Sequence, residues 1–256
     1  TGPLAPEEEL GLFVASAWGM KHEAQWRIPS YARWCEQEDA TPAYDGMADL
    51  LRLTGCIRGE DPDKPWLLKT PQHMLDLPAL LKVFPEARII FIHRDPAAVV
   101  GSSCSMAWNQ MSVHSDHVDP RWIGREWLRK TRLKVSRMAE ARALVRPGRM
   151  IDVHYDEMDR DWRGAMRRIY AFLDLDMAPA QPAMAGYMER SERERTFRSH
   201  SYRLKTFGLE PNNVRLCFQD YMRDFAIPLE TGPRNGARPR IPAAPRRRGY
   251  AAMPSN

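Results

Sequence analysis

The chain has 256 residues, of which 43% are hydrophobic and 28% are charged, and its net charge is +5. This length and composition predict a soluble globular protein with one domain and a sizeable core. Six arginines near the C-terminus carry more positive charge than the net +5 of the whole chain, so the rest of the chain is slightly acidic. The net charge therefore does not favour nucleic-acid binding by the folded part. These arginines are Arg234, Arg238, Arg240, Arg246, Arg247 and Arg248.

The pattern of cysteines and apolar segments indicates the compartment. No apolar stretch is long enough to span a bilayer, and Thr1 is not followed by a signal-peptide pattern. The four cysteines have no C-x-x-C pair and no histidine at ligand spacing, which favours buried thiols in a reducing cytoplasm over disulfides or a zinc site. We therefore expect a cytoplasmic protein without a metal. The cysteines are Cys35, Cys56, Cys104 and Cys217.

The first third of the chain is predicted to be helical and rich in aromatic residues. Apolar spacing and end signals predict helices over Glu7–Ala17, Ile28–Glu38 and Thr41–Thr54. The aromatic residues favour a core, with the lining of a binding pocket as the alternative. They are Trp18, Trp26, Tyr31 and Trp34.

The centre of the chain predicts a strand, a helix and a second strand. Trp66–Lys69 and Arg88–His93 are short apolar runs, and helical spacing marks Met74–Phe84 between them. Met150–Tyr155 has the character of a third strand. Such apolar strands are typical of a parallel sheet covered on both faces, so the predicted fold class is α/β, with a central parallel sheet flanked by helices.

Polar residues at the end of the second strand predict an anion site. Arg94 supplies a planar fork, Pro96 opens a new helix, and Ser102 follows eight residues after the arginine. The carboxyl ends of strands are where open α/β sheets bind ligands, and a helix N-terminus favours anions. The alternative is an Arg94–Asp95 salt bridge beside a serine-rich helix packed on the sheet.

The rest of the chain predicts further helices, two loops and a tail. We expect a mobile loop over Met106–Asp119, a charged flap over Glu192–Leu209, and a disordered tail over Thr231–Asn256, whose Pro, Arg and Gly content cannot build a core. The helices are predicted over Pro120–Val145, Asp161–Leu173, Pro179–Glu194 and Pro211–Phe225.

Four motifs in order resemble the sulfotransferase superfamily, which uses 3'-phosphoadenosine 5'-phosphosulfate (PAPS). They are LKTPQH at 68–73, HRDP at 93–96, VHYDEM at 153–158 and HSYRLKTFGL at 200–209. The resemblance, closest to bacterial members, extends from about residue 7 to Glu230. It implies a P-loop-NTPase-like sulfotransferase fold, with a domain over 1–230 followed by the tail at 231–256.

The resemblance also implies which residues bind the nucleotide. Arg94 and Ser102 match the family's arginine and serine that hold the 3'-phosphate, and Tyr155 matches the residue that contacts the adenine. His200 and Tyr202 match the bacterial form of the segment that folds over the nucleotide. From the residues alone, Tyr155 is equally consistent with a tyrosine that closes the core.

By the same resemblance, His73 is the candidate general base and Lys69 a sulfate or phosphate contact. A histidine suits this task because its ordinary pKa lies near neutrality. Two alternatives stay open: His73 caps the helix over Met74–Phe84, or another group, such as a glutamate near the phosphate loop, is the base.

One family feature is not found. The Gly-rich loop that binds the 5'-phosphosulfate occurs nowhere in the sequence, and Thr1 is not a methionine. We therefore expect an N-terminally incomplete domain, and a truncated, non-catalytic module that binds a 3'-phosphoadenosine nucleotide or a protein partner is the alternative function. A P-loop kinase is disfavoured, because no GxxxxGK[ST] motif occurs. The expected acceptor is a small-molecule, glycan or lipid hydroxyl, or an amine.

Overall fold

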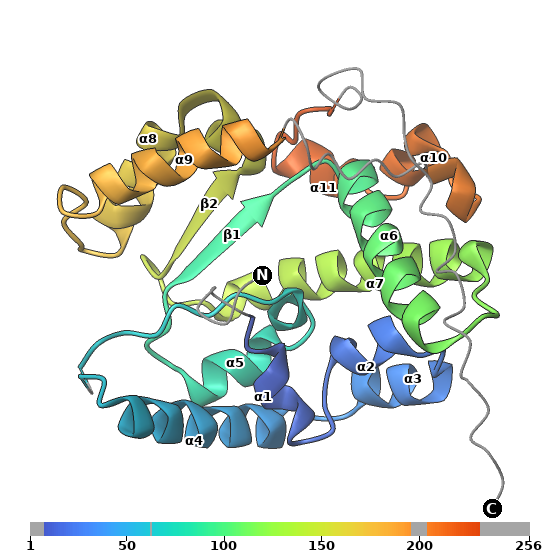
Figure 1. The fold of residues 1–256 in the computed structure, drawn as a ribbon, viewed down its shortest axis with the longest axis horizontal. Helices are drawn as coiled ribbons and strands as arrows, with labels where there is room; N and C mark the ends of the chain where they lie inside the picture. The colour runs from blue at the N-terminus through green and yellow to red at the C-terminus, as the bar shows by residue number, and fades with distance from the viewer. Residues whose placement is uncertain (1–7, 62, 196–203, 231–256) are drawn as a thin grey trace, which may run out of the picture.

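The computed structural model describes residues 8–61, 63–195 and 204–230, with side chains to residue 190 in the middle range. Its sheet consists of two parallel strands, β1 (Ile89–His93) and β2 (Met150–His154), which pair in register from Ile89 with Met150 to His93 with His154. Figure 1 shows α8 and α9 on one side of these strands and α5 and α7 on the other. The α/β fold class is therefore confirmed.

The predicted strand over Trp66–Lys69 is wrong. Within the described residues, no strand pairs with this segment, and Leu67 is 86% exposed. The backbone N–H of Lys69 donates to the carboxylate of Glu9 (3.0 Å) and not to a neighbouring strand. Apolar composition alone does not make a strand, because the backbone also needs a partner in the sheet.

Five short or medium helices precede β1. Helix α4 extends four residues beyond the prediction because Gly59, and not Gly55, adopts the left-handed conformation (φ 62°) that ends it. Of the helix predicted over Met74–Phe84, only Leu77–Val83 forms a helix, α5, and Met74 is the last residue of a preceding 3₁₀ turn. The elements are α1 (Leu10–Val14), α2 (Met20–Gln25), α3 (Pro29–Gln37), α4 (Thr41–Arg58), η1 (Pro71–Met74) and α5 (Leu77–Val83).

Helix α6 (Pro96–His114) begins where the sequence predicts and continues through the expected loop. Asp95 caps it by accepting from Ala97 N–H (2.8 Å). The loop predicted over Met106–Asp119 is wrong for most of its length, because Ala107 and Met111 are buried on the inner face of the helix.

Helix α7 (Pro120–Ala141) buries part of its basic side. The ammonium group of Lys130 lies between the carboxylates of Glu23 and Glu36 (2.8 Å to Glu36), and Arg129 binds Glu36 through two nitrogens (2.8 and 2.9 Å). Burial lowers the pKa of neighbouring Lys134 to about 8. The basic residues of this helix are therefore not a uniformly solvated face.

The end of the predicted flap packs against α7. Residues Leu204–Phe207 form a 3₁₀ turn, η3, whose Leu204 and Phe207 are buried. Gly124 allows this approach, because a methyl group there would overlap the carbonyl oxygen of Phe207. The part of the flap over 196–203 lies outside the described residues.

The described chain after β2 is mainly helical. Helix α8 (Tyr155–Phe172) has a kink at Asp161, where φ is −149°. The Asp161 side chain accepts from Gly164 N–H (2.9 Å). The helix predicted to start at Asp161 therefore corresponds to the part of α8 after the kink. The single helix predicted over Pro211–Phe225 is two. The remaining elements are η2 (Arg142–Leu144), α9 (Gln181–Arg195), α10 (Pro211–Leu216) and α11 (Gln219–Asp224), and the predicted tail at 231–256 lies outside the description.

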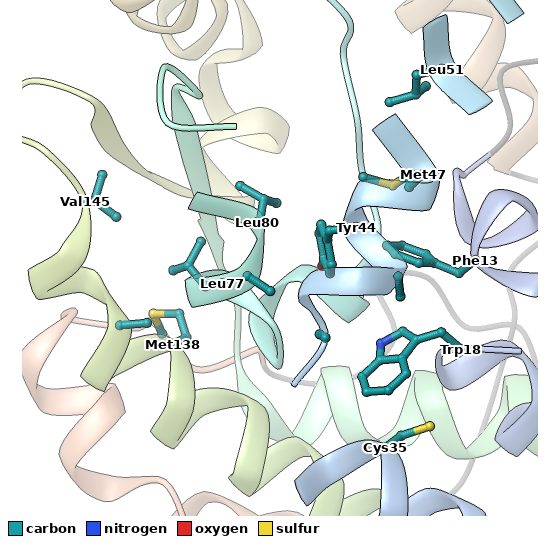
Figure 2. Packing of buried hydrophobic residues seen from close by; sticks show 14 of the residues in the cluster. Phe13, Trp18, Cys35, Tyr44, Met47, Leu51, Leu77, Leu80, Met138 and Val145 are labelled. Carbon is teal, nitrogen blue, oxygen red and sulfur yellow. The ribbon is translucent and has the colours of Figure 1, made fainter. Parts of the chain in front are cut away.

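One core cluster joins the N-terminal helices to α5 and α7. Figure 2 shows Phe13 and Tyr44 directed toward each other, and their ring centroids are 5.0 Å apart in an edge-to-face arrangement. Leu77, Leu80 and Met138 continue this cluster toward β1. A second cluster lies between α6 and α7. Its fully buried members include Val100, Cys104 and Ile123.

The cysteines differ in burial. Cys35 and Cys104 are buried thiols as predicted, and burial raises the pKa of Cys104 to about 12. The expectation is wrong for Cys56 and Cys217, which are exposed. In the part of the chain that the structure describes, no helix combines the length and apolar character that crossing a bilayer requires.

Candidate functional site

The candidate site lies where β1 and β2 end. Because His93 and His154 are register partners in parallel strands, the residues that follow them, Arg94 and Tyr155, emerge side by side. The guanidinium carbon of Arg94 lies 4.1 Å from the centre of the Tyr155 ring, a cation–π contact. The structure therefore brings together two of the residues predicted to form the site.

The fork of Arg94 holds a carboxylate at this edge. Its Nε donates to Oε1 of Glu230 (2.7 Å) and its Nη2 to Oε2 (3.0 Å). The side chains of Arg94 and Glu230 are 30% and 34% exposed, so the pair lies at the surface of the site and not in the core. The predicted alternative, an Arg94–Asp95 salt bridge, is wrong.

Asp95 makes a separate ion pair beneath this fork. Its fully buried carboxylate accepts from Nη2 of Arg215 (2.7 Å), from Nε of Arg215 (3.0 Å) and from the backbone N–H of Glu230 (2.9 Å). Burial alone would raise the pKa of Asp95, but these hydrogen bonds and the one from Ala97 hold that pKa below its usual range.

Ser102 lies on the exposed side of α6, eight residues after Arg94. Its proposed contact with a phosphate remains a prediction. His200 and Tyr202 lie outside the described residues, so the structure does not place them relative to this edge.

A buried histidine supports the end of β1. His93 directs Nε2 to Asp152 (2.7 Å) and Nδ1 to the hydroxyl of Tyr221 (3.1 Å), and it stacks on Phe225 with ring centroids 4.3 Å apart. Burial lowers the pKa of His93 despite the neighbouring carboxylate. Arg142 also binds Asp152 through two nitrogens (2.7 and 2.8 Å), so side-chain contacts fix this strand end.

The LKTPQH motif forms a second polar group. His73 lies in η1, and its ring joins Glu9 at Nε2 (2.6 Å) to the hydroxyl of Tyr44 at Nδ1 (2.8 Å). The residue at the N-cap position of the next helix, α5, is Asp76, so the alternative role of His73 as its cap is wrong. The histidine is instead held between an acid and a phenol.

The environments of Glu9 and Tyr44 indicate the proton arrangement. Burial would raise the pKa of Glu9, but hydrogen bonds from His73 and from Lys69 N–H lower it, so Glu9 is anionic. Burial raises the pKa of Tyr44 well above its usual value, so the phenol keeps its proton. An anionic carboxylate can only accept, so Glu9 accepts a hydrogen bond from Nε2–H of His73, and the Tyr44 hydroxyl lies at Nδ1 of the same ring.

Lys69 lies beside this group with its side chain 74% exposed. Its ammonium group pairs with Glu8, and its backbone N–H donates to Glu9. Sequence reasoning did not identify Glu9, Tyr44, Arg215 or Glu230. The run of glutamates at 7–9 marks the position of Glu9 only as acidic, and no pattern in the sequence indicates the other three. In the described ranges, no group of three metal-ligating residues is found.

Comparison with known proteins gives consistent matches. A profile of the sulfotransferase family matches residues 2–179. Two curated relatives, the omega-hydroxy-beta-dihydromenaquinone-9 sulfotransferases Stf3 of Mycobacterium bovis and Mycobacterium tuberculosis, are each 29% identical over 149 residues, which cover 55% of this chain and 36% of the relative. The chain thus spans about a third of the length of these relatives.

Two solved structures share the fold. Sulfotransferase STF9 from Mycobacterium avium matches with a TM-score of 0.78 and 29% identity, covering 90% of this chain and 60% of that one. Sulfotransferase STF1 from Mycobacterium tuberculosis matches with a TM-score of 0.71 and 29% identity, covering 84% of this chain and 55% of that one.

Proposed function

The chain belongs to the sulfotransferase family, and from this premise we propose that it takes part in transfer of a sulfuryl group from PAPS to an acceptor hydroxyl or amine. In this reaction the acceptor oxygen or nitrogen bonds to sulfur, the bond from sulfur to the 5'-phosphate oxygen breaks, and adenosine 3',5'-bisphosphate leaves. The two curated relatives are named for a hydroxylated menaquinone, which favours a lipid-like alcohol as the acceptor.

The observation that carries the proposal is the meeting of Arg94 and Tyr155 at the carboxyl edge of the sheet. Arg94 already binds a carboxylate through two parallel hydrogen bonds. A phosphate group offers the same pair of oxygens with more charge, so this fork fits a 3'-phosphate. The ring of Tyr155, 37% exposed, offers a surface on which adenine can stack.

For the proton of the acceptor, we propose the group formed by His73, Glu9 and Tyr44. In the neutral tautomer that donates from Nε2 to Glu9, Nδ1 is the unprotonated nitrogen, and it faces the Tyr44 hydroxyl. An acceptor hydroxyl can deliver its proton to His73 only if it replaces Tyr44 at Nδ1, after which anionic Glu9 stabilises the resulting imidazolium. Lys69 is the proposed contact to the transferred sulfuryl or phosphate oxygens, and binding them requires that it leave Glu8.

The donor proposal is tested by thermal-shift screening of the chain with adenosine 3',5'-bisphosphate, AMP and ATP. We expect the 3'-phosphorylated nucleotide to raise the melting temperature most, because ligands that bind only the folded state stabilise it by mass action. AMP is the matched control, since it differs only in the 3'-phosphate. Equal stabilisation by the bisphosphate and AMP would contradict a site that selects the 3'-phosphate.

A further inference from the structure

Glu230, the last described residue, contacts the candidate site at the carboxyl edge of the sheet through its backbone and its side chain. Its backbone N–H donates to Asp95 (2.9 Å), its carbonyl oxygen accepts from Arg215 (3.1 Å), and its carboxylate binds Arg94 (2.7 and 3.0 Å). The neighbouring residues Arg94 and Asp95 therefore bind the side chain and the backbone of the same glutamate.

These contacts fix the backbone of Glu230 more firmly than the backbones of a surface ion pair are usually fixed relative to each other. A typical exposed pair joins two long side chains whose backbones are independent. Here the backbone of Glu230 is tied to Asp95, which is itself fully buried and paired with Arg215. The carboxylate is thus presented to Arg94 from a fixed position.

The carboxylate of Glu230 and a phosphate would compete for the same donors. Nε and Nη2 of Arg94 are both engaged by Glu230, and these two nitrogens form one edge of the fork that suits a bidentate anion. Placing a doubly charged phosphate beside the unmoved carboxylate would bring like charges together in a partly buried space, which is unfavourable. Either the carboxylate turns away or the phosphate binds weakly.

We propose that Glu230 is an internal competitor for the nucleotide 3'-phosphate at Arg94, and that it sets the affinity of the site for 3'-phosphorylated nucleotides. The inference rests on the proposed function, because it assumes that Arg94 binds this phosphate. Rotation of the Glu230 side chain can release Nε and Nη2 of Arg94 while its backbone stays in place, since the hydrogen bonds to Asp95 and Arg215 use only the backbone of Glu230. The chain need not detach from the edge when the nucleotide binds.

The test is calorimetry of adenosine 3',5'-bisphosphate and AMP with wild type, Glu230→Gln and Glu210→Gln. Glutamine keeps the backbone contacts and removes the charge that holds the fork. Glu210 is an exposed carboxylate in the same C-terminal region, so Glu210→Gln makes the same charge change away from Arg94. We expect Glu230→Gln to bind the bisphosphate about three- to thirtyfold more tightly than Glu210→Gln does, because the conformation in which Arg94 can bind the phosphate is then more populated. AMP should bind both variants equally.

A double-mutant cycle separates competition at the fork from general repulsion. The gain from Glu230→Gln should disappear in an Arg94→Ala background, where no fork remains to be released. A gain of the same size with and without Arg94, or no gain over Glu210→Gln, overturns the competitor role while leaving the proposed function intact. If wild type does not prefer the bisphosphate to AMP, both the proposed function and this inference fail.

Discussion

The buried carboxylate of Asp95 is predicted to be a major stabilising group of the site. Asp95→Ala removes hydrogen bonds to Ala97 N–H, to Glu230 N–H and to two nitrogens of Arg215, whose side chain is only 20% exposed. Breaking a buried ion pair costs about 3–5 kcal/mol, and loss of a helix cap accounts for about 1 kcal/mol of such a change. We therefore expect the free energy of unfolding to fall by about 3–5 kcal/mol.

The assay is urea denaturation followed by circular dichroism, with Asp119→Ala as the matched control. Asp119 caps α7 by accepting from Arg121 N–H (2.9 Å) at an exposed position, so its loss should cost only about 0.5–2 kcal/mol. If Asp95→Ala costs no more than Asp119→Ala, the buried pair with Arg215 contributes nothing beyond the cap, and the reasoning is refuted.

The pH dependence of the same variant gives an independent check. The pKa of Asp95 is lowered in the folded protein, so its contribution is fully present above the unfolded value, near 3.9, and is lost as pH falls toward the folded value. The difference in stability between wild type and Asp95→Ala should therefore be constant near neutral pH and shrink as pH falls below about 4. A difference that grows in acid would contradict the assigned ionisation.

Three further predictions concern the packing of α7 and the proton-accepting group. Gly124→Ala should lower the free energy of unfolding by about 1–3 kcal/mol in urea titrations, because the new methyl group meets the carbonyl of Phe207, whereas an unchanged midpoint would show that the turn moves freely. Lys130→Met should cost about 3–5 kcal/mol in the same assay by leaving the buried carboxylate of Glu23 without its cation, while Glu36 keeps its pair with Arg129, and a stabilised variant would refute this pairing. In the intact protein, His73→Gln should reduce sulfuryl transfer at least about a hundredfold, while Tyr44→Phe should shift the pH–rate profile with a smaller loss; equal, pH-independent effects of both would argue against a base at His73.

Local signals in the sequence predict many of the elements. The apolar runs that become β1 and β2, and the prolines that open α3, α6, α7 and α10, act over a few residues, so they can be identified without the fold. The predicted strand at Trp66–Lys69 is wrong because strand formation does not depend on local signals alone. Whether an apolar run pairs as a strand depends on a neighbour in space, which periodicity does not supply.

In the candidate site, too, some residues could be predicted from the sequence and others could not. Arg94 could be predicted because it directly follows an apolar strand, whereas Tyr155 is identified by the family resemblance, and the parallel register places the two together. Glu9 is 64 residues from His73, and Glu230 is 136 residues from Arg94, so no spacing rule connects either pair. Such partners are set by the packing of whole helices, and only the folded structure reveals them.

The central claim is that Arg94 selects a 3'-phosphate, and the most direct measurement is calorimetry of adenosine 3',5'-bisphosphate and AMP with wild type, Arg94→Ala and Ser102→Ala. A charged hydrogen bond contributes about 1.5–3 kcal/mol, so Arg94→Ala should weaken bisphosphate binding about ten- to a hundredfold. Ser102→Ala should weaken it about three- to tenfold, since a neutral hydroxyl contributes less. AMP binding should be unchanged in both variants, whereas equal losses for the two nucleotides would show that Arg94 does not recognise the 3'-phosphate.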